Sequence, residues 1–239
     1  MVSKSQRKQI LQLKQKKYRL SQGFFVAEGE KVVQDLLKAG WKYSCLFTLT
    51  PISYPQAVQI SLEEMKQITH FKSPSPMLGV FEIPERKLKK PEPISIAVDK
   101  VSDPGNLGTI IRLCDWFGVD ELICSSDTVD CFNSKVVQAT MGSLVRVQCR
   151  YEPNLAGYLQ SLGKPLIGAD SSGASIYETS LPKKACFVFG SESHGISDEV
   201  SVLLNAQISI PNFRLNNGAE SLNVATATAI FLSEIFRGS

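Results

Sequence analysis

Short apolar segments alternate with helix-like stretches along most of the chain, and this alternation predicts an α/β protein. From residue 94 onward, six apolar runs have the length of strands: 94–101, 121–126, 143–150, 165–170, 185–191 and 206–211. Strands of this kind separated by helices form a mostly parallel sheet that is covered on both faces. Ligands of such sheets bind beyond the carboxyl ends of the strands. The loops that follow the strands are therefore the first place to look for a site.

The first ninety residues show the same alternation on a smaller scale. Residues 24–29 and 43–50 are strand-like, residues 30–40 and 61–69 are helix-like, and Gly40 stands where a helix should stop. A basic stretch flanked by prolines follows and is typical of a linker, which places a boundary near residues 84–93. We expect a small α/β domain with its linker at residues 1–90 and a larger domain at residues 91–239.

Composition makes this an ordinary globular chain of 239 residues, 43% of them hydrophobic and 21% charged. The N-terminal residues are polar and basic, and no segment reaches the apolar length of a membrane helix, so we expect a cytoplasmic protein. The six cysteines form no C-x-x-C pair, and the two histidines are not spaced as metal ligands. We therefore expect reduced cysteines and no metal site.

Charge is divided unequally between the two predicted domains. Residues 1–90 contain 16 Lys and Arg against 7 Asp and Glu, whereas the remaining residues contain 10 against 16. Residues 3–22 are predicted to form one basic amphipathic helix with Ile10, Leu13 and Leu20 on its apolar side. A solvated helix face is one interpretation, but the local excess of positive charge favours contact with a nucleic acid. The candidate RNA-binding residues are Lys4, Arg7, Lys8, Lys14, Lys16, Lys17 and Arg19.

Polar residues follow three of the predicted strands. After residues 94–101, a helix beginning near Asn106 contains Arg112 among apolar residues, where an arginine paired with an acid and a functional arginine are both reasonable. After residues 185–191, Gly190 and Gly195 bracket Glu192 in a turn that lacks either nucleotide-binding glycine signature. After residues 206–211, Glu220, Ser221 and Asn223 stand at the mouth of the last helix. Capping explains Ser221, but not Asn223 within the first turn.

These three segments, residues 99–120, 187–197 and 208–237, resemble in order and spacing the three motifs of the SpoU (TrmH-like) RNA 2′-O-ribose methyltransferases, and residues 24–37 resemble the small substrate-binding domain that often precedes them. The resemblance implies a parallel-sheet SPOUT domain with a deep trefoil knot near its C-terminus. It also implies S-adenosylmethionine as cofactor, tRNA or rRNA as substrate, and a homodimer with the active site beside its interface.

The resemblance also assigns residues. The catalytic positions are matched by Asn106, Arg112, Glu192, Ser221 and Asn223, and the main-chain cofactor positions by Gly190, Ile210 and Leu222. Residues 212–220 differ from the short glycine-containing loop that is common before the third motif in the family. The resemblance therefore does not define how this loop contacts the substrate.

The family's proposed proton acceptor is the motif arginine, here Arg112. A guanidinium is a poor base at neutral pH, so we assign to Arg112 first the binding of the target phosphate and the stabilisation of developing oxyanion charge, with proton acceptance as a further role. Two other functions are compatible with parts of this pattern. One is a non-catalytic RNA-binding protein that uses only the basic domain, and the other is a base methyltransferase of the wider knotted superfamily.

Overall fold

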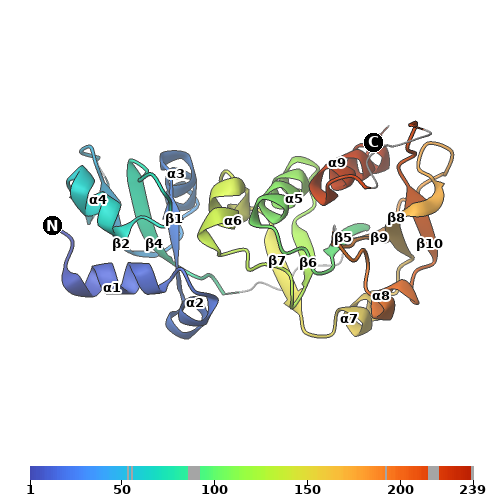
Figure 1. The fold of residues 1–239 in the computed structure, drawn as a ribbon, viewed down its shortest axis with the longest axis horizontal. Helices are drawn as coiled ribbons and strands as arrows, with labels where there is room; N and C mark the ends of the chain where they lie inside the picture. Colours follow the sequence, from blue (N-terminus) through green and yellow to red (C-terminus); the bar gives the residue numbers. More distant parts are fainter. Residues whose placement is uncertain (53, 55, 86–91, 192, 215–220, 238–239) are drawn as a thin grey trace. The chain divides into compact units, whose positions relative to one another are not determined.

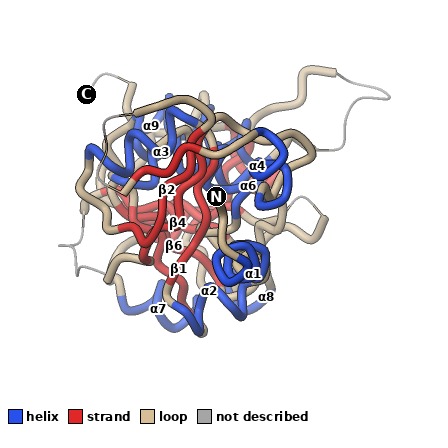
Figure 2. Tube along the Cα trace, turned by 90° about the vertical axis from the view of Figure 1, so that its left-hand side faces the viewer, coloured by secondary structure: helices blue, strands red, loops and turns tan. Residues whose placement is uncertain are grey.

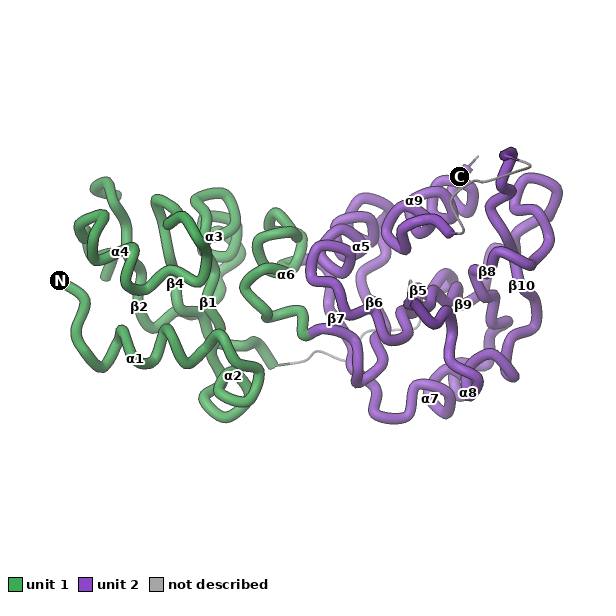
Figure 3. Tube along the Cα trace, in the orientation of Figure 1, with its two compact units in different colours: residues 1–87, 130–145 green, residues 88–129, 146–239 purple. Residues whose placement is uncertain are grey.

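The computed structural model describes residues 1–52, 54, 56–85, 92–191, 193–214 and 221–237, and the chain divides into two compact units (Figures 1 and 3). Unit 1 contains residues 1–87 and 130–145, and unit 2 contains residues 88–129 and 146–239. The predicted linker falls largely on residues 86–91, which lie outside the described residues. Residues 130–145 pack with the N-terminal residues in unit 1, although they lie about forty positions after the predicted domain boundary.

Unit 1 is built on a four-stranded sheet with the order β1-β4-β2-β3. Strand β4 is antiparallel to both neighbours, and β2 is parallel to β3. Its elements are α1 (Lys4–Gln12), α2 (Lys16–Gln22), β1 (Phe24–Glu28), α3 (Glu30–Lys38), β2 (Tyr43–Thr48), β3 (Ala57–Gln59), α4 (Leu62–Ile68), β4 (Met77–Glu82), α6 (Ser134–Ala139) and the 3₁₀ turn η1 (Ser143–Val145). The strands and helices expected at 24–29, 30–40, 43–50 and 61–69 are confirmed.

Alternate residues of β1 point to opposite faces of this sheet. Val26 belongs to a core with Ile10 of α1 and Met65 of α4, and in Figure 2 these two helices lie on the side of β1, β2 and β4 opposite to α3. On the other face, the Phe25 ring packs edge-on against Trp41 with ring centroids 5.9 Å apart, and it packs at a tilt against Phe132 at 4.9 Å. Both faces of the sheet are thus covered.

The basic segment does not form the single helix expected at residues 3–22. Helix α1 ends at Gln12 and α2 begins at Lys16. Ile10 and Leu13 are buried as expected, but Leu20 is exposed. The guanidinium of Arg19 donates to the carbonyl oxygens of Leu13 and Lys14 at 2.8 and 2.9 Å. These bonds satisfy carbonyl groups that a continuous helix would have bonded internally, so the break is stable.

Buried polar groups tie residues 130–145 into unit 1. The ring of His70 donates from Nε2 to the carbonyl oxygen of Ile10 at 2.7 Å, because a carbonyl can only accept, and its Nδ1 then accepts from the Ser134 hydroxyl at 2.5 Å. Burial lowers the pKa of His70 to about 4, so the ring is neutral at physiological pH. Arg19 also forms a buried ion pair with Asp130 at 2.6 Å.

Unit 2 contains a six-stranded sheet with the order β10-β8-β9-β5-β6-β7, and every pairing in it is parallel. Figure 1 shows α5 and α9 on one face of this sheet and α7 and α8 on the other. The elements are β5 (Ile94–Val98), α5 (Pro104–Trp116), β6 (Glu121–Ser125), β7 (Gln148–Glu152), α7 (Leu155–Ser161), β8 (Leu166–Ser175), β9 (Ala185–Phe189), α8 (Asp198–Ser201), β10 (Ala206–Ser209) and α9 (Val224–Ile235). The predicted parallel sheet covered on both faces is confirmed.

One predicted strand is displaced. The apolar run 143–150 was expected to be a single strand, but its first residues form η1 and only Gln148–Glu152 pairs in the sheet. The positive φ angles of Met141 and Gly142 turn the chain just before this run, and the 3₁₀ bond from Val145 N–H to the Gly142 carbonyl keeps its start out of the sheet.

Five of the six cysteine side chains are buried in the core. All six cysteines are free, and burial raises the pKa of Cys114 and of Cys186 to about 12. The five buried cysteines pack in the core as small apolar residues. Among the residues that the structure describes, no helix is both long and apolar enough to cross a bilayer.

Candidate active site

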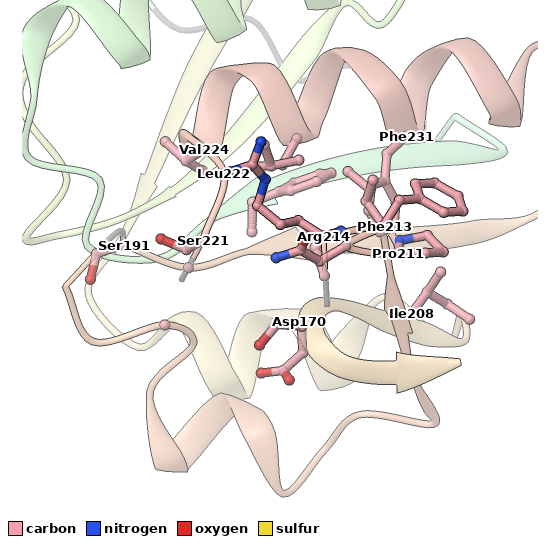
Figure 4. Close-up of a pocket in the computed structure, with 18 residues that line it drawn as sticks. Asp170, Ser191, Ile208, Pro211, Phe213, Arg214, Ser221, Leu222, Val224 and Phe231 are labelled. Atoms are coloured by element: carbon pink, nitrogen blue, oxygen red, sulfur yellow. The ribbon is translucent and has the colours of Figure 1, made fainter. Parts of the chain in front are cut away.

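A pocket of about 550 Å³ lies at the carboxyl ends of β9 and β10, beside the middle of β8 (Figure 4). Its walls come from the loop after β9, from the segment between β10 and α9, and from the start of α9 itself. Because the strands are parallel, their carboxyl ends share one edge of the sheet, and loops far apart in the sequence converge there. The three cofactor positions assigned from the sequence, Gly190, Ile210 and Leu222, all line this pocket.

The loop after β9 is a tight turn that only a glycine at position 190 allows. A Cβ atom at Gly190 would lie 2.0 Å from the carbonyl carbon of Gly195. The turn is closed by Ser191 and Gly195, which exchange both backbone hydrogen bonds at 3.1 and 2.9 Å. Its far end is held by the buried carboxylate of Asp99, which accepts from the Ser197 N–H at 2.9 Å. The pocket wall at Gly190 is therefore bare main chain held in a defined position.

Strand β8 supplies a wall that the sequence interpretation did not include. Its pairing with β10 jumps from Gly168 to Ala174, so residues 169–173 bulge out of the ladder, and Ala169, Asp170 and Ser171 line the pocket. Gly173 allows the chain to return, because a Cβ atom there would lie 2.4 Å from the backbone of Gln207. The Ser172 hydroxyl and N–H both donate to the Asp170 carboxylate, and these bonds lower the pKa of Asp170.

Asn223, rather than Ser221, caps the last helix. Its side-chain oxygen accepts from the N–H groups of Ala225 and Thr226 at 3.0 and 3.2 Å. Its amide nitrogen donates to the side-chain oxygen of Asn106 at 2.8 Å. One asparagine side chain thus both starts α9 and joins it to the first turn of α5. Ser221 is left free of the capping role and lines the pocket.

Helix α5 begins at Pro104 and is capped by Asp103, whose side chain accepts from the Asn106 N–H at 2.9 Å. Arg112 stands six residues beyond Asn106, about 9 Å along the helix axis. Its side chain is exposed, and no ion pair or hydrogen bond of that side chain occurs among the described residues. The interpretation of Arg112 as a core arginine held by an acid is therefore wrong for the described part of the chain. Arg112 also lies outside the pocket lining.

Two of the predicted polar positions, Glu192 and Glu220, lie outside the described residues. The sequence interpretation also missed most of the pocket lining, including the polar or exposed residues Asp170, Ser171, Phe213 and Arg214. Asp170 is the last residue of the strand predicted at 165–170 and Ser171 follows it, so both stand at a predicted carboxyl end, as the other site residues do. The signal for Phe213 was a large aromatic residue within a polar loop.

The predicted RNA-binding residues of unit 1 divide into two groups. Six are exposed, namely Lys4, Arg7, Lys8, Lys14, Lys16 and Lys17. Arg19 is only 2% exposed, and its donors are taken by Asp130 and by the carbonyls of Leu13 and Lys14. The assignment of Arg19 to RNA contact is therefore corrected: it is a structural residue of unit 1.

The pocket suits an organic cofactor. Its volume lies within the range of about 300 to 1,000 Å³ that is usual for small-molecule sites. Its inner side is apolar, with Phe189, Ile208 and Phe231, and the bare main chain at Gly190 would accept close approach of a ligand. Among the described lining residues, Asp170 is the one carboxylate and Arg214 the one cation. The described residues contain no group of three His, Cys, Asp or Glu side chains that could hold a metal ion.

Comparisons with known proteins agree on both parts of the chain. Residues 93–233 match the model of the SpoU rRNA Methylase family, and residues 4–79 match that of the MRM3-like substrate binding domain. The chain is 29% identical over 227 residues to the 23S rRNA (guanosine(2553)-2'-O)-methyltransferase RlmP of Bacillus subtilis, an alignment that covers 91% of this chain and 90% of the relative.

Solved structures show the same fold. A TrmH-family structure from Porphyromonas gingivalis superposes with a TM-score of 0.88 at 37% identity and covers 100% of both chains. An AdoMet-bound rRNA methyltransferase from Sinorhizobium meliloti superposes with a TM-score of 0.83 at 29% identity, covering 99% of this chain and 97% of that one.

Proposed function

The chain belongs to the SpoU rRNA Methylase family and is an S-adenosylmethionine-dependent RNA methyltransferase that acts on a ribose 2′-hydroxyl, and we propose that its substrate is 23S ribosomal RNA. The observation that supports this substrate is the alignment with a 23S rRNA 2'-O-methyltransferase along nine-tenths of both chains. We propose a location in the cytoplasm, which is supported by the alignment with a bacterial rRNA methyltransferase along nine-tenths of both chains.

We propose that S-adenosylmethionine is held by the main chain at Gly190, Ile210 and Leu222, with the Asp170 carboxylate complementing its positive charge. When bound, the cofactor supplies an electrophilic methyl group. Arg112 binds the phosphate next to the target ribose and stabilises the negative charge that develops as the 2′-hydroxyl proton is lost. Asn106, held by Asn223, fixes the end of the helix that carries Arg112. The trefoil knot implied by the resemblance remains a prediction.

The protein is proposed to act as a homodimer that forms through α5. Trp116 is 85% exposed, and Arg112 lies four residues before it on the same face of the helix. An interface on this face would bury Trp116 and would place Arg112 at the interface, beside which the resemblance implies that the active site lies. Sedimentation of the full chain should give the mass of a dimer, and Trp116→Glu should give the mass of a monomer. A monomeric wild-type chain would contradict this proposal.

The substrate is tested by mapping 2′-O-methylation on 23S rRNA and on tRNA from cells that contain or lack the protein. We expect one ribose of 23S rRNA to lose its methyl group when the protein is absent. The purified chain should then restore that group on the undermethylated RNA with S-adenosylmethionine alone. A lost methyl group on tRNA would contradict the choice of substrate, and a lost methyl group on a base would contradict ribose methylation.

Cofactor binding should not require RNA, because every proposed contact lies in unit 2. We expect Gly190→Ala to weaken S-adenosylmethionine binding by at least about fivefold, because its Cβ atom would lie 2.0 Å from the Gly195 carbonyl carbon and would push this wall of the pocket out of place, and overpacking of this kind costs about 1 to 3 kcal/mol. Gly163→Ala is the control for a strained glycine substitution outside the site, because Gly163 has a φ of +59°, which favours glycine, and no place in the pocket lining. Titration calorimetry measures both. Equal affinity of Gly190→Ala and wild type would place the cofactor elsewhere.

A further inference from the structure

We propose that Phe213 is a stacking platform for a nucleobase of the RNA substrate, and that Arg214 beside it binds the backbone phosphate of the same strand. This inference rests on the proposed function, because it concerns the RNA side of the same site. Both residues belong to the loop between β10 and α9, and both line the pocket.

Phe213 differs from the other phenylalanines of the pocket. Phe189 and Phe231 are buried and pack edge to face at 5.3 Å, so they build the wall. Phe213 is 83% exposed. An exposed aromatic ring is not in itself informative, because single apolar side chains are common on protein surfaces. Its position is informative: the ring stands at the rim of a pocket that an RNA strand must approach for methyl transfer.

The backbone holds Phe213 in this position without a ligand. Pro211 restricts its own φ angle, and the side-chain oxygen of Asn212 accepts from the Arg214 N–H at 2.9 Å, forming a local turn around Phe213. Figure 4 shows Asp170 on one side of the pocket and Leu222 with Val224 on the other, with Phe213 and Arg214 between these sides. The ring is therefore presented at the opening by the loop itself.

The chemistry of the pair fits a nucleotide. Nucleobases removed from a helix stack on exposed aromatic rings whatever their identity, because every base has a π-face. A guanidinium binds phosphate through paired hydrogen bonds. Arg214 is the cation among the described lining residues, and it is the direct neighbour of the exposed ring. The proposed cofactor contacts at Gly190, Ile210 and Leu222 are main-chain positions elsewhere in the lining, so base and cofactor do not compete for the same groups.

The test compares Phe213→Ala, Phe213→Leu and Phe213→Trp in the full chain. The probes are a 23S rRNA transcript made in vitro and S-adenosylmethionine labelled in its methyl group. Losing one base–aromatic stack should raise both the Kd and the KM for the transcript by roughly 5- to 100-fold, with S-adenosylmethionine affinity unchanged. Phe213→Leu keeps an apolar side chain without a planar face and should be defective, whereas Phe213→Trp should be active. Val202→Ala is the control, because Val202 is 81% exposed and outside the pocket lining.

Three results would overturn the stacking role. The first is a Phe213→Ala protein that binds the transcript as tightly as wild type does. The second is a Phe213→Ala protein that binds S-adenosylmethionine more weakly, which would assign the ring to the cofactor. The third is a Phe213→Ala protein with an altered sedimentation mass, which would assign the ring to a subunit interface. Filter binding of the transcript measures the stack without catalysis. A wild-type chain that binds the transcript but does not methylate it would contradict the proposed substrate and leave the binding comparison valid. A wild-type chain that does not bind the transcript would overturn both the proposed substrate and the stacking role of Phe213.

Discussion

Replacing Arg112 by alanine is expected to lower methyl transfer by at least about a hundredfold while the protein stays folded. A loss of this size is typical when one preorganised charge-stabilising donor is removed from an active site. Folding should be retained because the Arg112 side chain is exposed, and cofactor affinity should be retained because the residue lies outside the pocket lining. Single-turnover methyl transfer, calorimetry with S-adenosylmethionine and a thermal melt on the same preparation measure the three quantities.

Arg112→Lys separates charge from geometry. Lysine keeps the positive charge but lacks the planar fork that binds a phosphate through two hydrogen bonds. Partial activity would indicate that charge is sufficient, and an activity as low as that of Arg112→Ala would indicate paired hydrogen bonding. A folded Arg112→Ala protein with wild-type turnover would contradict the catalytic assignment and would favour a non-catalytic RNA-binding role.

Replacing Arg19 by alanine is expected to have the largest effect on stability. It leaves the Asp130 carboxylate without its ion-pair partner and the Leu13 and Lys14 carbonyls without their donor. Removing one member of a buried ion pair costs about 3 to 5 kcal/mol. For a unit of this size, such a loss lowers the melting temperature by roughly 10 °C or more. Differential scanning calorimetry of the full chain measures the change.

Lys17→Ala is the matched control, because Lys17 belongs to the same helix but is exposed. The Lys17 ammonium lies 4.9 Å from the centre of the Tyr18 ring. This exposed cation–π contact is worth only about 0.5 to 1 kcal/mol, so the free energy of unfolding should change little. RNA affinity should fall instead, and the slope of log affinity against log salt should decrease by about 0.7 to 0.9 for one lost phosphate contact. A stable Arg19→Ala protein with a reduced salt slope would restore Arg19 to the RNA-binding surface.

Point substitutions test the basic segment better than deletion of residues 1–90. Residues 130–145 belong to unit 1, where Phe132 packs against Phe25 and Ser134 bonds to His70. Deleting the N-terminal residues would expose this segment and would confuse loss of RNA binding with loss of folding.

The order and type of most elements follow from the sequence alone, because they depend on local periodicity. The apolar runs that became β5, β6, β8, β9 and β10 are bounded by turn residues within a few positions, and the parallel arrangement follows from the helices between most of them. The same regularity directed attention to the loops after the strands. The segments after β5, β9 and β10 contain the residues that the structure brings to one edge of the sheet. Asn106 follows β5, Gly190 follows β9, and Ile210, Leu222 and Asn223 follow β10.

Tertiary contacts decided what local pattern cannot encode. Arg19 looks like the exposed lysines around it, but its ion pair with Asp130, 111 residues away, joins the nearby Leu13 and Lys14 carbonyls in holding it buried. By local preference, either Ser221 or Asn223 could cap the last helix. Asn223 is the cap, and its side chain is hydrogen-bonded to Asn106, 117 residues away. Asp170 enters the pocket because β10 pairs with β8 on both sides of a bulge. Each outcome depends on a partner far away in the sequence, whereas periodicity and capping preferences report only on neighbours within a few turns of the chain.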